Sequence, residues 1–196
     1  MDTKMIVGSI LIIITIAVSG QTEGKGSTQK QTNMEQQKFT AKKETWTRVM
    51  HTLGSANETF PLLCPVREYD WIPTWKCNMI YSESGVAEDM CVFKTHFSLE
   101  EDEETWVCTY YEKDRRIEYL HYYPNRIERL RIALIEEKPT TSDWKWETSV
   151  IGLNEAGNKQ IESMEQSRQF FAINERLEKE LNFYLCHHKM IDNNNQ

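Results

Sequence analysis

The last long segment of the chain, residues 154–191, constrains the fold more than any other part of the sequence. Apolar residues recur there at the spacing of one helix face and charged residues fill the opposite face, which predicts an amphipathic helix capped by Asn154. A helix of roughly thirty residues is about 45 Å long and needs a large partner surface. Its apolar face comprises Ile161, Met164, Phe170, Phe171, Ile173, Leu177, Leu181, Tyr184 and Leu185.

The sequence before this helix predicts the strands of that partner surface. Apolar and polar residues alternate over residues 45–53, and the capping box Ser55-x-x-Glu58 then opens a short, broken helix. About six further alternating runs follow as successive hairpins, the first of which turns at Ser84-Gly85. We therefore expect an α+β fold, in which a curved antiparallel sheet of about seven strands wraps around the long C-terminal helix.

The N-terminus is typical of an export signal. Lys4 precedes an apolar run over residues 5–18, which is shorter than the roughly twenty residues of a membrane span. We expect residues 1–20 to be a signal peptide cleaved before Gln21, and a short membrane anchor over residues 5–18 is the alternative. The mature protein would then be periplasmic or extracellular.

The rest of the chain divides into a linker, one domain and a tail. Residues 21–41 are mostly polar, with Gly24, Gly26, Ser27, Thr28 and several Gln and Lys, which predicts a disordered linker. Residues 42–191 form the expected domain, and residues 192–196 form a tail. A net charge of −7 and a pI near 5.3 argue against nucleic acid as a partner. Arg126, Arg129 and Arg131 alternate with apolar residues, as polar positions on a strand do.

The cysteines give no clear disulfide framework. The chain has five of them, an odd number, and no CxxC motif. Since an exported protein can hold disulfides, Cys64 and Cys77 are the first pair to test. The alternative is that the cysteines are buried as small apolar side chains.

Four stretches of the chain carry a resemblance to a known family: residues 60–77 (FPLLCPVREYDWIPTWKC), 84–88 (SGVAE), 105–107 (TWV) and 152–158 (GLNEAGN). Over residues 42–191 the chain resembles the START and birch-pollen-allergen-like superfamily, also called SRPBCC or polyketide cyclase-like, in its uncharacterised bacterial branch. The resemblance implies a helix-grip fold with a cavity between sheet and long helix that takes lipids, sterols or polyketides. It implies no catalytic residue, because the family has no universal catalytic motif.

Signatures of catalysis are missing from the sequence. There is no G-x-S-x-G, G-x-G-x-x-G, P-loop or H-E-x-x-H motif. Glu118-x-x-His121 resembles half of a metal motif, but it falls in a predicted strand, where residues i and i+3 point to opposite faces. We therefore expect no metal and no cofactor.

Aromatic residues, some of which also carry a polar group, are the best candidates for a ligand site, although such residues more often simply fill the core. Strand alternation favours the faces of Trp106 and Tyr110, and of Tyr119 and His121, as those toward the helix. An Arg67–Glu68 pair in the broken helix could orient a ligand carboxylate or carbonyl. The candidate cavity residues are Arg67, Glu68, Trp71, Trp75, Trp106, Tyr110, Tyr119, His121 and Phe171.

These observations favour an exported domain that binds a small apolar ligand, such as a lipid, a sterol or a polyketide-like molecule, without catalysis. One alternative is a cyclase- or hydratase-type enzyme that uses His121 or Glu68 with Tyr110 or Tyr119. Another is an interaction domain whose interior is closed. An open cavity separates the first hypothesis from the third, and convergence of the named polar groups would favour the second.

Overall fold

The computed structural model describes residues 39–95 and 104–192. The expected signal segment, most of the expected linker, the loop that precedes β4 and the last four residues lie outside these ranges. No helix within the two ranges is both long and apolar enough to cross a membrane.

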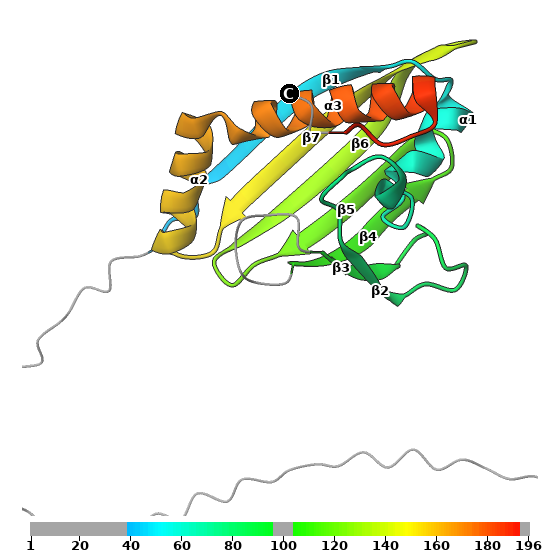
Figure 1. Ribbon diagram of the computed structural model, residues 1–196. Coiled ribbons are helices and arrows are strands. Elements are labelled where there is room, and N and C mark those ends of the chain that lie inside the picture. The colour runs from blue at the N-terminus through cyan, green and yellow to red at the C-terminus, as the bar shows by residue number, and fades with distance from the viewer. Residues whose placement is uncertain (1–38, 96–103, 193–196) are drawn as a thin grey trace, which may run out of the picture. The chain divides into compact units, whose positions relative to one another are not determined.

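The described residues form one antiparallel sheet of seven strands in the order β1-β7-β6-β5-β4-β3-β2 (Figure 1). Every neighbouring pair is antiparallel, and the helices cover one face of the sheet, here called the inner face. The predicted α+β helix-grip arrangement is confirmed. The strands are β1 (Lys43–Thr52), β2 (Cys77–Tyr81), β3 (Val92–Thr95), β4 (Glu104–Glu112), β5 (Arg116–Tyr122), β6 (Arg126–Lys138) and β7 (Thr141–Gly152).

The short broken helix after β1 is also present. It consists of α1 (Ala56–Thr59) and two 3₁₀ helices, η1 (Phe60–Leu63) and η2 (Glu68–Asp70). The predicted capping box opens it, because the Ser55 backbone N–H donates to the Glu58 carboxylate at 2.9 Å.

The C-terminal segment is two helices rather than the single one that its periodicity predicts. They are α2 (Glu155–Ser167) and α3 (Gln169–His187), and Figure 1 shows them at an angle to each other. Arg168 joins them in the left-handed conformation, with φ of 53°. The apolar stripe lacks a member at Ser167–Arg168, so a continuous helix would place polar side chains against the sheet there.

The core lies between the inner face and the helices. Trp144, Met50 and Ile132 are at most 1% exposed on this face, and Leu181 of α3 is fully buried against them. The alternation along β5 is as expected, since Ile117, Tyr119 and His121 are all buried. The large apolar side chains thus hold the helices on the sheet.

Strand alternation predicts that Tyr110 lies on the inner face, and this is wrong because of a β-bulge in β4. The register of β4 against β5 shifts between Cys108 and Tyr110, which adds one residue and reverses the alternation beyond it. Tyr110 is consequently 39% exposed, and its hydroxyl donates to Glu112 at 3.1 Å. Tyr111 takes the inner position, where its ring lies 5.5 Å from that of Phe60.

Ion pairs cross the outer face of the sheet. The Glu118 carboxylate accepts hydrogen bonds from Arg116 and from Arg131, and Arg131 also donates to Glu147 at 3.1 Å. Although burial alone would raise the pKa of Glu118, the two guanidinium groups hold it below its ordinary value. Glu118 and His121 lie on opposite faces, as strand spacing predicts.

All five cysteines are free thiols. The Cys64 sulfur accepts a hydrogen bond from the Ala87 backbone N–H at 3.0 Å and is not bonded to Cys77. Cys64, Cys91 and Cys108 are buried, as the alternative to a disulfide framework requires.

A glycine fixes the start of α2 against the sheet. Asn154 caps the helix as predicted, accepting from the Gly157 N–H at 3.0 Å. A Cβ atom on Gly157 would lie 1.9 Å from the carbonyl oxygen of Asn125, in the turn between β5 and β6. Only glycine therefore allows this approach of helix and turn.

We expect Gly157→Ala to lower the free energy of unfolding by about 3 kcal/mol, because the added methyl group has to push the helix off the turn. Lys159→Ala, at an exposed position of the same helix, is the matched control and should change stability little. Chemical denaturation measures both. Equal stabilities for the two variants would contradict the close packing described here.

Candidate functional site

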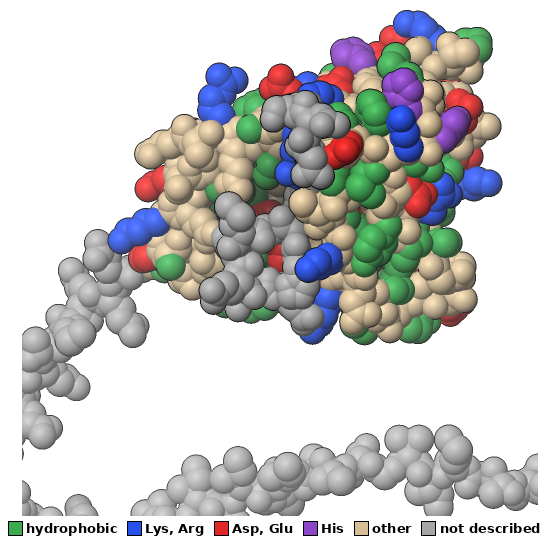
Figure 2. All heavy atoms as spheres, viewed as in Figure 1, with side chains coloured by type: hydrophobic (Ala, Val, Ile, Leu, Met, Phe, Trp, Pro, Cys, Tyr) green, Lys and Arg blue, Asp and Glu red, His purple; other side chains and the backbone are tan. Residues whose placement is uncertain are grey.

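A partly enclosed cavity of about 380 Å³ lies between the inner face and the helices α2 and α3. Figure 2 shows this side of the molecule, with hydrophobic and acidic atoms visible in a hollow near its centre. The cavity is lined by Trp46, Glu104, Trp106, His121, Tyr123, Arg126, Glu128, Leu130, Trp146, Thr148, Gln160, Ser163, Met164, Gln169, Phe170, Ile173, Asn174 and Leu177.

The cavity lies where side chains of α2 and α3 do not pack fully against the inner face of the sheet. Polar side chains of α2 and α3, namely Gln160, Ser163, Gln169 and Asn174, line it together with apolar ones. These residues flank the break at Arg168, where the apolar stripe is interrupted. The same irregularity that divides the helix thus leaves space above the sheet.

One wall of the cavity is a stack of three rings. The His121 ring lies between those of Trp106 and Tyr123, with centroid separations of 4.1 and 3.9 Å. Both outer rings are tied to Glu104: the Tyr123 hydroxyl donates to it at 2.9 Å, and the Trp106 N–H reaches it through the hydroxyl of Thr95. This network orders the wall without involving the histidine.

His121 is fully buried, and neither ring nitrogen has a hydrogen-bond partner among the described residues. Burial, and secondarily the positive charge of Arg126, lower its pKa to about 3. The imidazole is therefore neutral at physiological pH. Such a low pKa makes it a poor general base, because an efficient base titrates near the working pH.

The charged groups at this end of the cavity compensate one another. The Arg126 guanidinium lies 3.4 Å from the centre of the Tyr123 ring and donates to Glu128 at 2.6 Å. Burial, together with Glu128 and Glu104, raises the pKa of Tyr123 well above its ordinary value. Tyr123 is thus a neutral hydrogen-bond donor at any ordinary pH.

A second group of polar atoms without partners lies toward the opposite end. Trp146 is 4% exposed and its indole N–H has no acceptor, while Asn174 is 4% exposed and its side-chain oxygen has no donor. The Nε of Arg48, in the neighbouring strand, also lacks a partner, but Arg48 does not line the cavity. Leaving a buried polar atom unpaired costs about 1–3 kcal/mol, so two such atoms in the wall of one cavity, those of Trp146 and Asn174, call for a binding partner.

Two of the nine residues expected at a ligand site, Trp106 and His121, line this cavity together. Phe171 is only half-buried, and its ring lies at right angles to that of Phe170, which does line the cavity. Tyr110 lies on the outer face because of the bulge in β4.

None of the other five candidates lines this cavity. Trp71 and Trp75 donate to the carbonyl oxygens of Leu62 and Pro65, and Tyr119 donates to that of Leu63. These three side chains support the broken helix. They do not line the cavity.

The predicted Arg67–Glu68 pair is absent. Arg67 instead donates to Asp70 at 2.7 Å and lines two smaller hollows beside the broken helix. Burial raises the pKa of Glu68 to about 8, so its carboxyl group is largely uncharged at neutral pH. Glu68 and His121 do not line a common cavity.

Sequence reasoning missed Glu104, Arg126 and Asn174 as site residues. Residue 126 is on the inner face, whereas Arg129 and Arg131 are on the outer face. Strand alternation places residue 126 opposite to residues 129 and 131, but it does not say which of the two faces meets the helices. Glu104, at the end of an acidic run, carries no signal of burial in the sequence, although it is 3% exposed.

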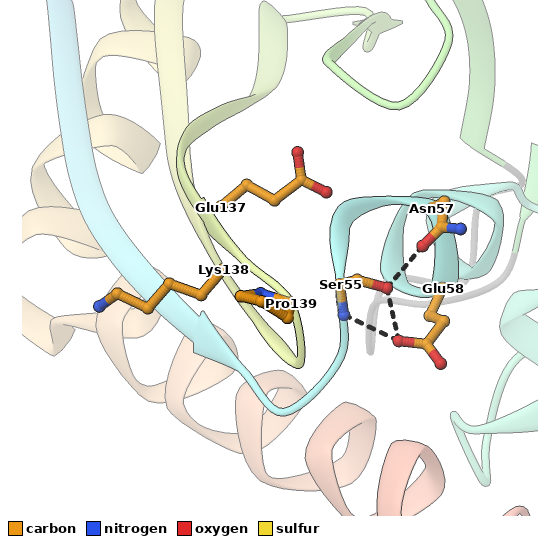
Figure 3. Close-up of a pocket in the computed structure, with 6 residues that line it drawn as sticks. All are labelled: Ser55, Asn57, Glu58, Glu137, Lys138 and Pro139. Atoms are coloured by element: carbon orange, nitrogen blue, oxygen red, sulfur yellow. Dashed lines mark hydrogen bonds between the residues drawn. The ribbon is translucent and has the colours of Figure 1, made fainter.

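A different, more open hollow lies between the β6–β7 hairpin and α1 (Figure 3). It is lined by Glu137, Lys138 and Pro139 of the hairpin and by Ser55, Asn57 and Glu58, although the Lys138 side chain points away from α1 in Figure 3. Because its walls are polar and open, it lacks the apolar enclosure of a typical ligand site. Within residues 39–95 and 104–192, no group of three His, Cys, Asp or Glu side chains could hold a metal ion.

No protein-family model and no curated protein sequence matches the chain. Its fold is similar to that of solved structures. Norcoclaurine synthase from Thalictrum flavum, in complex with dopamine and hydroxybenzaldehyde, is 13% identical with a TM-score of 0.53, over 75% of this chain and 89% of that one. An uncharacterised protein from Rhizobium leguminosarum is 12% identical with a TM-score of 0.53, over 74% and 96% of the two chains. Ara h 8.0201 is 11% identical with a TM-score of 0.50, over 74% and 99%.

These similarities identify the fold class. The chain has the helix-grip fold of the birch-pollen-allergen-like, or SRPBCC, superfamily, as the resemblance in its sequence predicted.

We expect His121 to make the protein less stable in acid. Its pKa is about 3 in the folded protein and near 6.5 in the unfolded chain, so between these values only the unfolded chain binds the proton. Stability is therefore lost as the pH falls below 6.5, by about 2 kcal/mol at pH 5 from this residue alone.

The measurement is chemical denaturation of the protein and of His121→Phe at pH 7 and pH 5. The variant should lose less stability on acidification. Glu68, whose raised pKa acts in the opposite direction, is the same in both proteins. Identical pH dependence of the two proteins would show that His121 is not buried in its neutral form.

Proposed function

We propose that this protein is an exported domain that binds a small apolar ligand, such as a lipid, a sterol or a polyketide-like molecule, in the cavity between sheet and helices and does not catalyse a reaction on it. The observation that carries the proposal is the half-enclosed cavity, which aromatic and aliphatic side chains line together with polar ones. The ligand-bound norcoclaurine synthase structure supports it, as a case in which this fold accompanies small aromatic molecules. Export rests on the N-terminal sequence.

The polar groups favour binding over catalysis. The enzyme hypothesis needs His121 or Glu68 to converge with Tyr110 or Tyr119, yet of these only His121 lines the cavity. Its pKa of about 3 does not suit acid–base chemistry at neutral pH. The hypothesis of a closed interior is disfavoured by the cavity itself.

Native mass spectrometry of the protein from its own host tests both parts of the proposal. We expect a mature chain that begins at Gln21 and carries one small apolar molecule, which denaturing extraction releases for identification. A chain that retains residues 1–20 would overturn export with cleavage. If the mass shows no added molecule, ligand binding is tested with the cavity variants described below.

Filling the cavity should abolish binding. Ile173 of α3 lines the cavity and is partly buried. Because the larger indole would occupy the space of the ligand, Ile173→Trp should lower the affinity for the dye N-phenyl-1-naphthylamine by about tenfold or more. This dye is uncharged and its fluorescence depends on the polarity of its surroundings. The matched control is Ile135→Trp, at a position that is 54% exposed in β6. Fluorescence titration measures both. Equal binding by the two variants, or no binding by the unmodified protein, contradicts the proposed site.

A further inference from the structure

The unpaired atoms of Trp146 and Asn174 define the kind of polar group that the cavity accepts. The two residues come from different elements, β7 and α3, yet both line the cavity. One atom is a hydrogen-bond donor and the other is an acceptor. Whatever occupies the space between them has to accept one hydrogen bond and donate another.

The packing of α3 places these atoms at the same level of the sheet. Trp146 is the cross-strand partner of Arg48 in β1. One helix turn before Asn174, the Phe170 ring stacks on Trp46 at 6.3 Å, and one turn after it, Glu178 pairs with Arg48. Asn174 thus lies over the Arg48–Trp146 pair.

The orientation of the Asn174 amide is fixed by its other end. Its Nδ2 donates to the backbone carbonyl oxygen of Phe170 at 2.8 Å, so the oxygen is the atom left without a partner. A rotated amide would lose that bond. The acceptor at this site is therefore defined by the hydrogen-bond network.

The positive charge of Arg48, next to Trp146 in the sheet, is already neutralised by an ion pair. The Arg48 guanidinium pairs with Glu178 of α3, although its Nε has no partner. A ligand carboxylate would bring a second negative charge to a paired arginine and would face the Asn174 oxygen, which repels it. An ammonium group would face the indole N–H of Trp146, from which it cannot accept a hydrogen bond.

We propose that the ligand carries an uncharged group that both accepts and donates a hydrogen bond, of which a hydroxyl group is the simplest, and that this group lies between Trp146 and Asn174. The hydroxyl oxygen accepts from the indole N–H, and the hydroxyl hydrogen is donated to the Asn174 oxygen. This inference rests on the proposed function and adds the chemical class of the ligand: a neutral, hydroxylated apolar molecule. His121 is not part of this site, because it lies at the level of Glu128 and Val150, four residues along β7 from Trp146.

Four probes test the proposal: the ten-carbon molecules 1-decanol, decanoate and decylamine, and decyl methyl ether, which has one carbon more. Each is titrated at pH 7 against bound N-phenyl-1-naphthylamine. We expect decanol to displace the dye about three- to tenfold more effectively than the ether, which accepts a hydrogen bond but donates none. Decanoate and decylamine should be weaker than decanol. Stronger displacement by decanoate would assign recognition to Arg48 and overturn the proposal.

The outcomes separate this inference from the proposed function. If the dye binds and the alcohol and the ether displace it equally, the cavity remains a ligand site, but the proposal that the ligand carries a hydroxyl group is overturned. The unpaired atoms would then be assigned to bound water. Stronger displacement by decylamine than by decanol overturns the proposal of a hydroxyl group as well. Failure of the dye to bind the unmodified protein overturns the proposed function itself.

Two tryptophan variants provide matched controls. Trp146→Phe removes an indole N–H that has no partner, whereas Trp144→Phe removes one that donates to Ser142 at 2.8 Å outside the cavity. Only Trp146→Phe should reduce the preference for decanol over the ether, to about twofold or less. Without ligand, Trp146→Phe should lower the Tm less than Trp144→Phe does, because no hydrogen bond is lost. A preference for decanol that Trp146→Phe leaves intact overturns the proposal.

Discussion

The left-handed turn at Arg168 decides which part of the sheet is covered and which part is left open. With it, α2 and α3 each pack an apolar face on the sheet while meeting at an angle. Around the turn the helices present glutamine, serine and asparagine side chains instead of the aliphatic ones that would complete a core. A space lined by both kinds of side chain is the result, and its position follows from the helix geometry rather than from a dedicated binding loop.

The polar atoms in this space differ in how completely they are paired. Glu104, Tyr123, Arg126 and Glu128 satisfy one another and keep the wall of stacked rings in place. The ring nitrogens of His121, within that wall, and the polar atoms of Trp146 and Asn174, at the other end, are left unpaired. A protein interior normally pairs such groups, because an unpaired one is costly. The charged groups of the cavity are thus satisfied, whereas three of its uncharged side chains keep an unpaired polar atom.

The order of the elements, the capping box, the Asn154 cap and the hairpins could be predicted because each depends on residues close together in sequence. Trp106 and His121 were placed correctly on the inner face by strand alternation, which holds as long as the strand is regular. Tyr110 was not, since the bulge that reverses its orientation has no signature in the sequence. The role of Arg126 depends on which face of β6 meets the helices, and that is decided by residues far away in the chain.

The bulge in β4 also bears on how a chain of this kind can change in evolution. Substitutions of Tyr110 or Tyr111 alter one side chain on one face. Loss of the one extra residue between Cys108 and Tyr110 would instead remove the bulge and restore regular pairing, with Tyr110 still opposite Glu118 and Tyr111 still opposite Ile117. Both tyrosines would keep their faces, and Tyr111 would stay beside Phe60. Comparisons among related chains should therefore allow a one-residue gap at this point, because chains with and without the bulge place the rest of the strand on the same faces.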